Sequence, residues 1–132
     1  MTELRIADAA RFLGVSDDTV RRWVDQGTLR STRSGTGQLV VDGLELARLL
    51  KERSVRPEDP AQVASSARNR FVGLVTDVVS DTVMSQVELQ CGPHRVVSLM
   101  STEAVRELGL EPGVVATAVV KSTNVVVETP RT

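Results

Sequence analysis

Two short polar runs in the second half of the chain carry residues that could hold a small oxyanion. The first is Ser65-Ser66-Ala67-Arg68-Asn69, and the second is Lys121-Ser122-Thr123. Each run combines hydroxyl groups and backbone N–H donors with one fixed cation, which suits an anion bound without a metal. Lys121 would act as a compact point charge and Arg68 as a set of fixed donors. The sequence predicts an anion site if the two runs meet.

The chain offers little for catalysis. His94 is the only histidine and follows Pro93 in a predicted turn, so no Ser/His/Asp or Cys/His set can be assembled. Cys91 is the only cysteine, which excludes a disulfide framework and favours a cytoplasmic location. No apolar run reaches the ~18 residues that a membrane span needs. We expect a binding protein that is not an enzyme and does not contact membranes.

Length and composition favour two small domains. Of the 132 residues, 41% are hydrophobic and 25% are charged, which is ordinary for globular proteins. Pro57 and Pro60 break the helical pattern and mark a linker. We therefore predict domains at residues 1–54 and 65–132, joined by a linker at 55–64. Because aromatic residues are almost absent, both cores must be aliphatic, and small domains of this kind often gain stability by association.

Residues 1–54 show the pattern of a helix-turn-helix. Apolar positions predict helices over 7–13, 17–26 and 43–53. Gly14 ends the first helix and Ser16 caps the second. Two short helices joined by a turn with glycine form a helix-turn-helix unit. The Ser34-Gly35-Thr36-Gly37 run predicts a hairpin turn before the third helix.

This half resembles the winged helix-turn-helix of MerR-type and excisionase-type regulators. The resemblance is carried by Ala-Ala-x-x-Leu-Gly-Val-Ser at Ala9–Ser16 and by Thr-Val-Arg-Arg-Trp-Val at Thr19–Val24. It implies that residues 17–26 form a DNA-recognition helix and that the hairpin is the wing. The strand that returns from the wing lacks the basic and aromatic residues usual in the family. The resemblance implies DNA contacts from Ser16, Thr19, Arg21, Arg22, Arg30 and Arg33.

In residues 65–132 the apolar positions recur with the two-residue period of β-strands. Strands are predicted at 71–79, 82–90, 95–100, 114–121 and 125–128, with a helix at 103–108. Five short strands with one helix between the third and the fourth indicate an OB-like Greek-key barrel. The whole chain is therefore predicted to be α+β, with a winged helix-turn-helix followed by a five-stranded barrel.

This half resembles a Mop domain, the molybdate-binding, TOBE-type domain of molbindins. Three landmarks carry the resemblance: Ser-Ala-Arg-Asn-x-x-x-Gly at Ser66–Gly73, the run Ser101–Gly113, and Val-Lys-Ser-Thr at Val120–Thr123. It implies that molybdate or tungstate is the ligand and that it binds where two subunits meet. The oxyanion-binding residues that the resemblance implies are Ser66, Ala67, Arg68, Ser101, Lys121 and Ser122. Asn69 and Thr123 are expected to hold these residues in place without contacting the anion.

Together these features predict a molybdate- or tungstate-responsive transcriptional regulator that binds DNA. The alternative is an intracellular store or buffer of the oxyanion, whose helix-turn-helix does not bind DNA. The resemblance implies a homo-oligomer, at least a dimer and up to a hexamer. The two oxyanions are close in size and shape, and the sequence does not choose between them.

Overall fold

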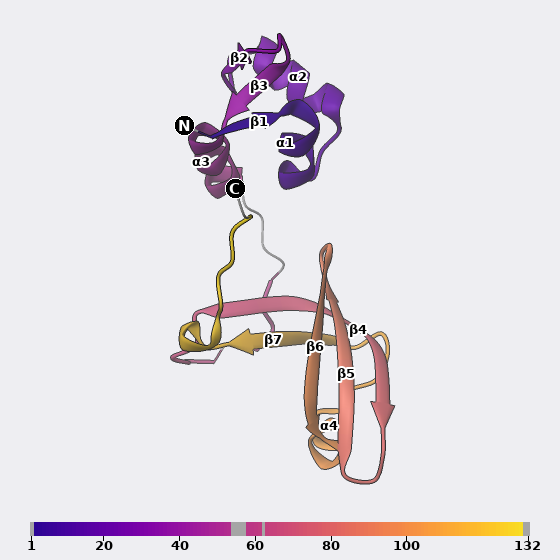
Figure 1. Cartoon of the computed structure of the whole chain (residues 1–132). Coiled ribbons are helices and arrows are strands. Elements are labelled where there is room, and N and C mark those ends of the chain that lie inside the picture. The colour runs from indigo at the N-terminus through magenta and orange to yellow at the C-terminus, as the bar shows by residue number, and fades with distance from the viewer. Residues whose placement is uncertain (1, 54–57, 62, 131–132) are drawn as a thin grey trace. The chain divides into compact units, whose positions relative to one another are not determined.

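The computed structural model describes residues 2–53, 58–61 and 63–130, so part of the predicted linker lies outside the described residues. The chain forms two compact units, Met1–Arg56 and Pro57–Thr132. We call them the head and the C-terminal unit. The head combines helices with a small sheet, and the C-terminal unit is built mainly from a curled antiparallel sheet (Figure 1). The predicted α+β class is confirmed. No helix among the described residues has the length and apolar character that crossing a membrane requires.

The head has three helices and a three-stranded sheet. Its elements are β1 (Glu3–Arg5), α1 (Ile6–Leu13), α2 (Asp17–Asp25), β2 (Ser31–Arg33), β3 (Leu39–Asp42) and α3 (Gly43–Arg53). The strands lie in the antiparallel order β1-β3-β2. Strand β1 was not predicted, because three residues with one apolar side chain give no period-2 signal. Its strand character comes from pairing with β3.

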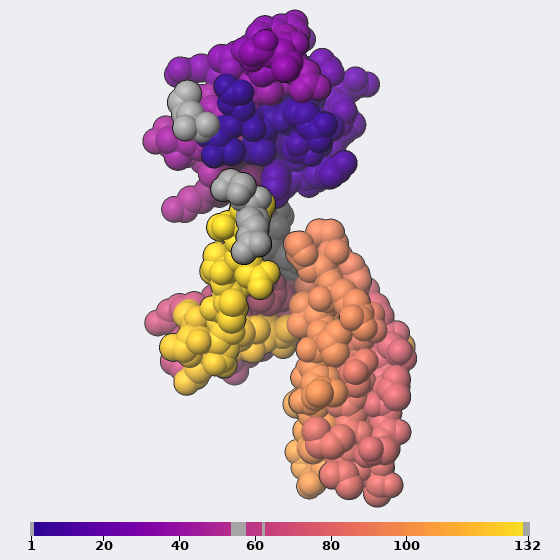
Figure 2. All heavy atoms as spheres, viewed as in Figure 1, coloured from indigo at the N-terminus to yellow at the C-terminus, as the bar shows by residue number. Residues whose placement is uncertain are grey.

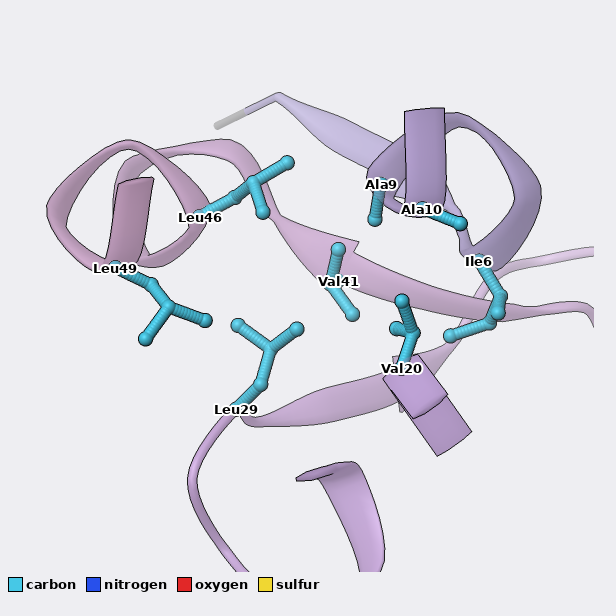
Figure 3. Close-up of a cluster of buried hydrophobic side chains, with 8 residues drawn as sticks. All are labelled: Ile6, Ala9, Ala10, Val20, Leu29, Val41, Leu46 and Leu49. Carbon is cyan, nitrogen blue, oxygen red and sulfur yellow. The ribbon is translucent and has the colours of Figure 1, made fainter. Parts of the chain in front are cut away.

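Local signals explain the helix-turn-helix. Gly14 takes the left-handed conformation (φ 69°) that ends α1. Ser16 then caps α2, because its hydroxyl accepts a hydrogen bond from the N–H of Thr19 at 3.2 Å. The helices pack over β3 around the side chains drawn in Figure 3, and Val20, Leu29 and Val41 are almost fully buried there. The head closes this core with its own residues.

The C-terminal unit is organised by one long strand. Its elements are β4 (Asn69–Ser80), β5 (Met84–Cys91), β6 (His94–Ser101), α4 (Thr102–Leu108), β7 (Val115–Val120) and the 3₁₀ turn η1 (Ser122–Asn124). The sheet order is β6-β5-β4-β7, with all neighbours antiparallel. The first half of β4 pairs with β7 and the second half with β5, and the register shifts between Val75 and Asp77. This irregularity lies where β4 turns in Figure 1.

A close approach of backbone inside the sheet explains one glycine. Gly73 lies on β4 opposite Ala116 of β7. A Cβ at Gly73 would lie 2.4 Å from the carbonyl oxygen of Gln90 and 2.7 Å from the Sγ of Cys91. The Cys91 thiol is buried, and its desolvation raises its pKa. Only a residue without a side chain allows β4 and the end of β5 to meet here.

The other end of the sheet is fixed by buried hydroxyl groups. Ser85 and Thr102 are 2% and 5% exposed, and their hydroxyl oxygens lie 2.8 Å apart. The Thr102 hydroxyl also donates to the backbone oxygen of Asp81 at 2.9 Å, and Ser80 Oγ lies 2.7 Å from Ser85 Oγ. These bonds satisfy the buried polar groups and hold the start of α4 against the β4–β5 hairpin.

The prediction of a strand at residues 125–128 differs from the structure. This segment follows η1 and has no strand pairing within the chain, and Val126 and Val127 are 84% and 82% exposed. Figure 1 shows it leaving the sheet, and Figure 2 shows the last described residues, in yellow, at the surface. Three successive valines have a high strand propensity, but no described strand of the same chain pairs with this segment. Four strands are therefore formed in the described part of the C-terminal unit.

Candidate functional site

The two polar runs meet at one end of the C-terminal sheet. Asn69, at the start of β4, pairs with Val120, at the end of β7. The side chain of Asn69 also donates from Nδ2 to the backbone oxygen of Val120 at 3.1 Å. Because the strands are antiparallel, Arg68 and Lys121 are the next residues beyond this pair. The fold therefore places the backbone of the two predicted cationic residues at the same end of the sheet, where Asn69 joins the two strands.

The first run forms a compact turn. The hydroxyl of Ser65 accepts a hydrogen bond from the N–H of Ala67 at 3.1 Å, and Arg68 donates from Nη1 to the backbone oxygen of Ser65 at 3.2 Å. Ala67 is buried, whereas Ser66 and Arg68 are exposed. The Ala67 N–H would have to leave the Ser65 hydroxyl to bind an anion. Ser66 and Arg68 already face solvent.

The second run begins the 3₁₀ turn that follows β7. Lys121 caps η1, and its backbone oxygen accepts from the N–H of Asn124 at 2.9 Å. Ser122 is the first residue of η1, a position whose N–H is not used within a helix. Lys121, Ser122 and Thr123 are all exposed. This end of the sheet thus presents two cations with hydroxyl and N–H donors, the groups that a tetrahedral dianion with four acceptor oxygens requires.

Ser101 lies elsewhere in the chain. It pairs with Met84 at the end of the sheet where Ser80 pairs with Ser85. Arg68 precedes the first residue of β4, whereas Ser80 is its last, so the two ends of this strand separate Ser101 from Arg68. The Ser101 hydroxyl accepts from the N–H of Ala104 at 3.1 Å and caps α4. A single chain does not bring Ser101 to the other predicted anion ligands.

Asp59 is a residue that the sequence reasoning placed in the linker without a role. Its carboxylate accepts hydrogen bonds from Arg70 Nε at 2.7 Å and from Thr117 Oγ1 at 3.1 Å. The bond from Arg70 and the one from the N–H of Ala61 lower the pKa of Asp59. We call Asp59, Arg70 and Thr117 the Asp59 clip. No sequence signal identified it, because its partners lie 11 and 58 residues away.

In the head, the predicted DNA contacts divide between the recognition helix and the wing. Arg21 and Arg22 are exposed on α2, and Thr19 is half-buried. The hydroxyl oxygens of Ser16 and Thr19 lie 3.0 Å apart, so the capping residue and the first turn of α2 are hydrogen-bonded through their side chains. The predicted helix is thus present and exposes both arginines, and its role in DNA recognition stays a prediction.

The wing arginines have partners in the head. Arg30 Nε lies 3.6 Å from a carboxylate oxygen of Glu45 on α3. Arg33 donates from Nη1 to the backbone oxygen of Gly37 at 3.1 Å and so braces the turn of the hairpin. Both side chains are exposed, and surface contacts of this kind are weak.

A hollow beside α2 adds two residues that were not predicted. Its volume is about 210 Å³, and its lining combines four polar residues with three apolar ones: Arg5, Asp17, Arg21 and Gln38, and Ile6, Ala7 and Leu39. Arg5 stands at the start of α1, where it pairs with Asp8 at 3.2 Å. Its position between β1 and α1 depends on the unpredicted strand. The hollow therefore brings residues of α1, α2 and the hairpin to one surface of mixed polar and apolar character.

Comparison with known proteins matches each half to a family model. A helix-turn-helix domain matches residues 3–54, and a TOBE domain matches residues 65–127. Molybdenum-pterin-binding protein 2 of Clostridium pasteurianum is 40% identical over 63 residues, which cover 47% of this chain and 93% of that protein. Molybdenum-pterin-binding protein 3 of the same organism is 38% identical over the same shares.

Among solved structures, the cytoplasmic molybdate-binding protein ModG with molybdate bound is similar to this chain. The two share 31% sequence identity with a TM-score of 0.51, over 76% of this chain and 82% of ModG. The relatives are named as binding proteins. The resemblance stated from the landmarks at Ser66–Gly73, Ser101–Gly113 and Val120–Thr123 is thus confirmed. The chain carries a helix-turn-helix domain followed by a TOBE domain, and through the latter it belongs to the family of the molybdenum-pterin-binding proteins.

Proposed function

We propose that the protein is a molybdate- or tungstate-responsive transcriptional regulator, in which an oxyanion bound by the C-terminal unit changes how the head binds DNA. One observation carries this proposal. Arg68 and Lys121 flank the terminal Asn69–Val120 pair of β4 and β7, in the unit that matches the TOBE model. The matched relatives are named for molybdate or molybdenum-pterin binding.

The exposure of the site supports binding between subunits. Ser66, Arg68, Lys121 and Ser122 all face solvent in one chain. Hydrogen bonds and charge attract an anion strongly only where water is excluded. A second surface must therefore cover this end of the sheet. Ser101, at the other end of β4, fits the same scheme if a neighbouring subunit supplies it.

The open side of the sheet supports assembly independently. An apolar groove of about 470 Å³ lies between residues of β6 and residues of β7, over a floor that includes Val87 and Leu89. β6 and β7 are the two edge strands of the sheet. A fifth strand in this gap would pair with both edges and close an OB-like barrel. We propose that residues 125–128 of a second copy fill it, which makes the assembly at least a dimer.

The heads supply the DNA-binding side of the proposal. Arg21 and Arg22 are exposed on α2, which would enter a groove of the DNA. Arg5 and Gln38 would contact the phosphate backbone of the DNA from the adjoining hollow. In an assembly the heads come in pairs. An anion that binds one arrangement of the subunits more tightly than another shifts the protein toward that arrangement. The affinity for DNA then changes to an extent set by the difference between the anion's affinities for the two arrangements.

Calorimetry and DNA binding test the two halves of this proposal. We expect tight binding of molybdate and tungstate by the full chain, and loss of that binding in Arg68→Ala and in Lys121→Ala without unfolding. Loss of a charged hydrogen-bonding partner costs about 1.5–3 kcal/mol, or roughly 10- to 150-fold in affinity. Arg106→Ala, an exposed arginine on α4, is the matched control. Normal molybdate affinity in both site variants would refute the assignment.

The regulatory half requires a defined duplex. Selection from a random-sequence DNA pool gives the preferred site, and the affinity for this duplex is then measured with and without saturating molybdate. We expect the two affinities to differ by at least about fivefold, as usual for coupled sites. Equal affinities would overturn the regulatory proposal.

An oxyanion store is the second candidate, and the wing favours it. Arg30 and Arg33 have partners within the head, and the returning strand β3 has no basic residue. A store would bind molybdate tightly yet select no duplex from the pool. Tight molybdate binding without a selected duplex would therefore favour the storage function over the regulatory one.

A further inference from the structure

The Asp59 clip holds the segment before the anion site against both strands that form it. Asp59 and Arg70 are each largely screened from solvent, with side chains 28% and 24% exposed. The carboxylate has three donors, namely the Arg70 guanidinium, the Thr117 hydroxyl and the Ala61 N–H at 2.9 Å. These donors come from two strands and from the segment itself. The start of the described C-terminal unit is therefore tied to the sheet at a single side chain.

The clip and the candidate anion site use the same ends of the same strands. Arg70 is the second residue of β4, two positions after Arg68, and it pairs with Val119 of β7. Thr117 lies on β7, four positions before Lys121, and pairs with Val72. A change in the spacing or twist of these two strand ends would change the distance between the two donors that Asp59 bridges.

The head has an anchor of its own on the other side of the linker. Arg53, the last residue of α3, places its guanidinium 4.5 Å from the centre of the Trp23 ring. Trp23 belongs to α2, the candidate recognition helix. Such cation–π contacts contribute about 0.5–1 kcal/mol at exposed sites. Residues 54–58 alone connect this anchor to Asp59, so a change at Asp59 acts on a short length of chain.

We propose that Asp59 is a positioning residue that couples anion occupancy at the ends of β4 and β7 to the linker, in which it lies. The inference rests on the proposed regulatory function and names the element that transmits it. An anion drawn between Arg68 and Lys121 favours one separation of the two strand ends. The clip is stronger at one separation than at the other, so the sheet holds the linker at Asp59 differently with and without the anion.

A structural role alone does not account for the clip well. Partly exposed ion pairs contribute little to stability, because side-chain entropy and hydration offset the attraction. The strength of hydrogen bonds that bridge two strands depends on the separation of the strands, even where these bonds add little to the stability of the sheet. The Asp59 clip would then affect the response to anion more than it affects folding.

The test compares Asp59→Asn with Glu58→Gln, a neighbouring exposed acid that serves as the control. Molybdate affinity is measured by calorimetry. The affinity for the selected duplex is measured with and without molybdate, and the ratio of the two DNA affinities is the coupling. For Asp59→Asn we expect molybdate affinity within about threefold of wild type and a coupling that falls at least fivefold or to unity. Glu58→Gln keeps the wild-type coupling.

Each other outcome overturns a specific statement. Wild-type coupling in Asp59→Asn overturns the positioning role and leaves the regulatory function intact. A wild-type protein without coupling overturns both. A large loss of molybdate affinity in Asp59→Asn places Asp59 in the anion site itself and overturns the transmission role. If Asp59→Asn fails to fold by circular dichroism, Thr117→Val removes one donor only and is judged by the same criteria.

Discussion

Gly73→Ala should destabilise the C-terminal unit and leave the head unchanged. The new Cβ would lie 2.4 Å from the carbonyl oxygen of Gln90, well inside the 3.4 Å at which ordinary contact begins. The nearest atom is backbone and cannot rotate away, so β4 and the end of β5 must separate. Overpacking of a core typically costs about 1–3 kcal/mol, and we expect at least ~3 kcal/mol here because the obstacle is fixed.

The size of the unit makes this loss measurable. Stabilities of about 0.05–0.15 kcal/mol per residue give the C-terminal unit roughly 4–11 kcal/mol. A loss of ~3 kcal/mol lowers its urea midpoint by about 1–3 M. Trp23 is the only tryptophan and lies in the head, so its fluorescence follows the head alone, while far-ultraviolet circular dichroism follows both units. The titrations are compared at one protein concentration.

Two glycine controls separate the contact from other effects of alanine. Gly92→Ala lies in the same unit, has open space around the new Cβ and bears only the strain of φ +60°, which costs about 1–2 kcal/mol. Gly35→Ala lies in the head in open space without a positive φ, and should be near neutral. The reasoning is refuted if Gly73→Ala is no more destabilising than Gly92→Ala. Adding Cys91→Ala to Gly73→Ala should restore only part of the loss, because the Gln90 carbonyl remains.

Three further substitutions test the head, the assembly and the site. The double substitution Arg21→Ala with Arg22→Ala should lower DNA affinity at least tenfold in fluorescence anisotropy, since each substitution removes about one charged contact. Molybdate affinity, measured by calorimetry, should stay unchanged. Retained DNA affinity would place the DNA-binding surface elsewhere. Val126→Ser with Val127→Ser should weaken the oligomer by at least tenfold in analytical ultracentrifugation. Adjacent side chains of a strand point to opposite faces, and the one valine that enters the groove contributes about 1.5–3 kcal/mol; an unchanged dissociation constant would exclude this segment from the interface. Ser101→Ala should cost about 1 kcal/mol of stability through the lost cap of α4, and Ser101→Asn should restore the cap but not molybdate affinity if the hydroxyl binds the anion; normal molybdate affinity in both variants would remove Ser101 from the site.

The sequence predicted the parts of the fold that local chemistry specifies. Ser16 and Gly14 mark the boundary between α1 and α2, and both act in the structure as their residue types predict. The α+β class and the resemblance to a TOBE-type domain are confirmed. The meeting of the two polar runs also follows from the antiparallel pairing of the strands that they flank. The roles of the individual anion and DNA residues stay predictions.

The remaining features depend on partners that local sequence does not name. Strand β1 exists because β3 lies beside it, and the Asp59 clip exists because β4 and β7 present two donors together. The valines at 125–127 have the propensity of a strand, but propensity does not say which edge accepts them. Ser101 shows a further ambiguity, because the same hydroxyl can cap a helix or bind an anion.

The proposed filling of the groove between β6 and β7 by a second copy would make the stability of the C-terminal unit depend on protein concentration. Each edge strand leaves backbone groups that only water or an added strand can satisfy. A strand supplied by another copy adds its binding free energy to the folded state, and the size of that addition grows with concentration. The head closes its own core and gains nothing in this way. A cell that makes few copies would then hold a less stable protein than a cell that makes many.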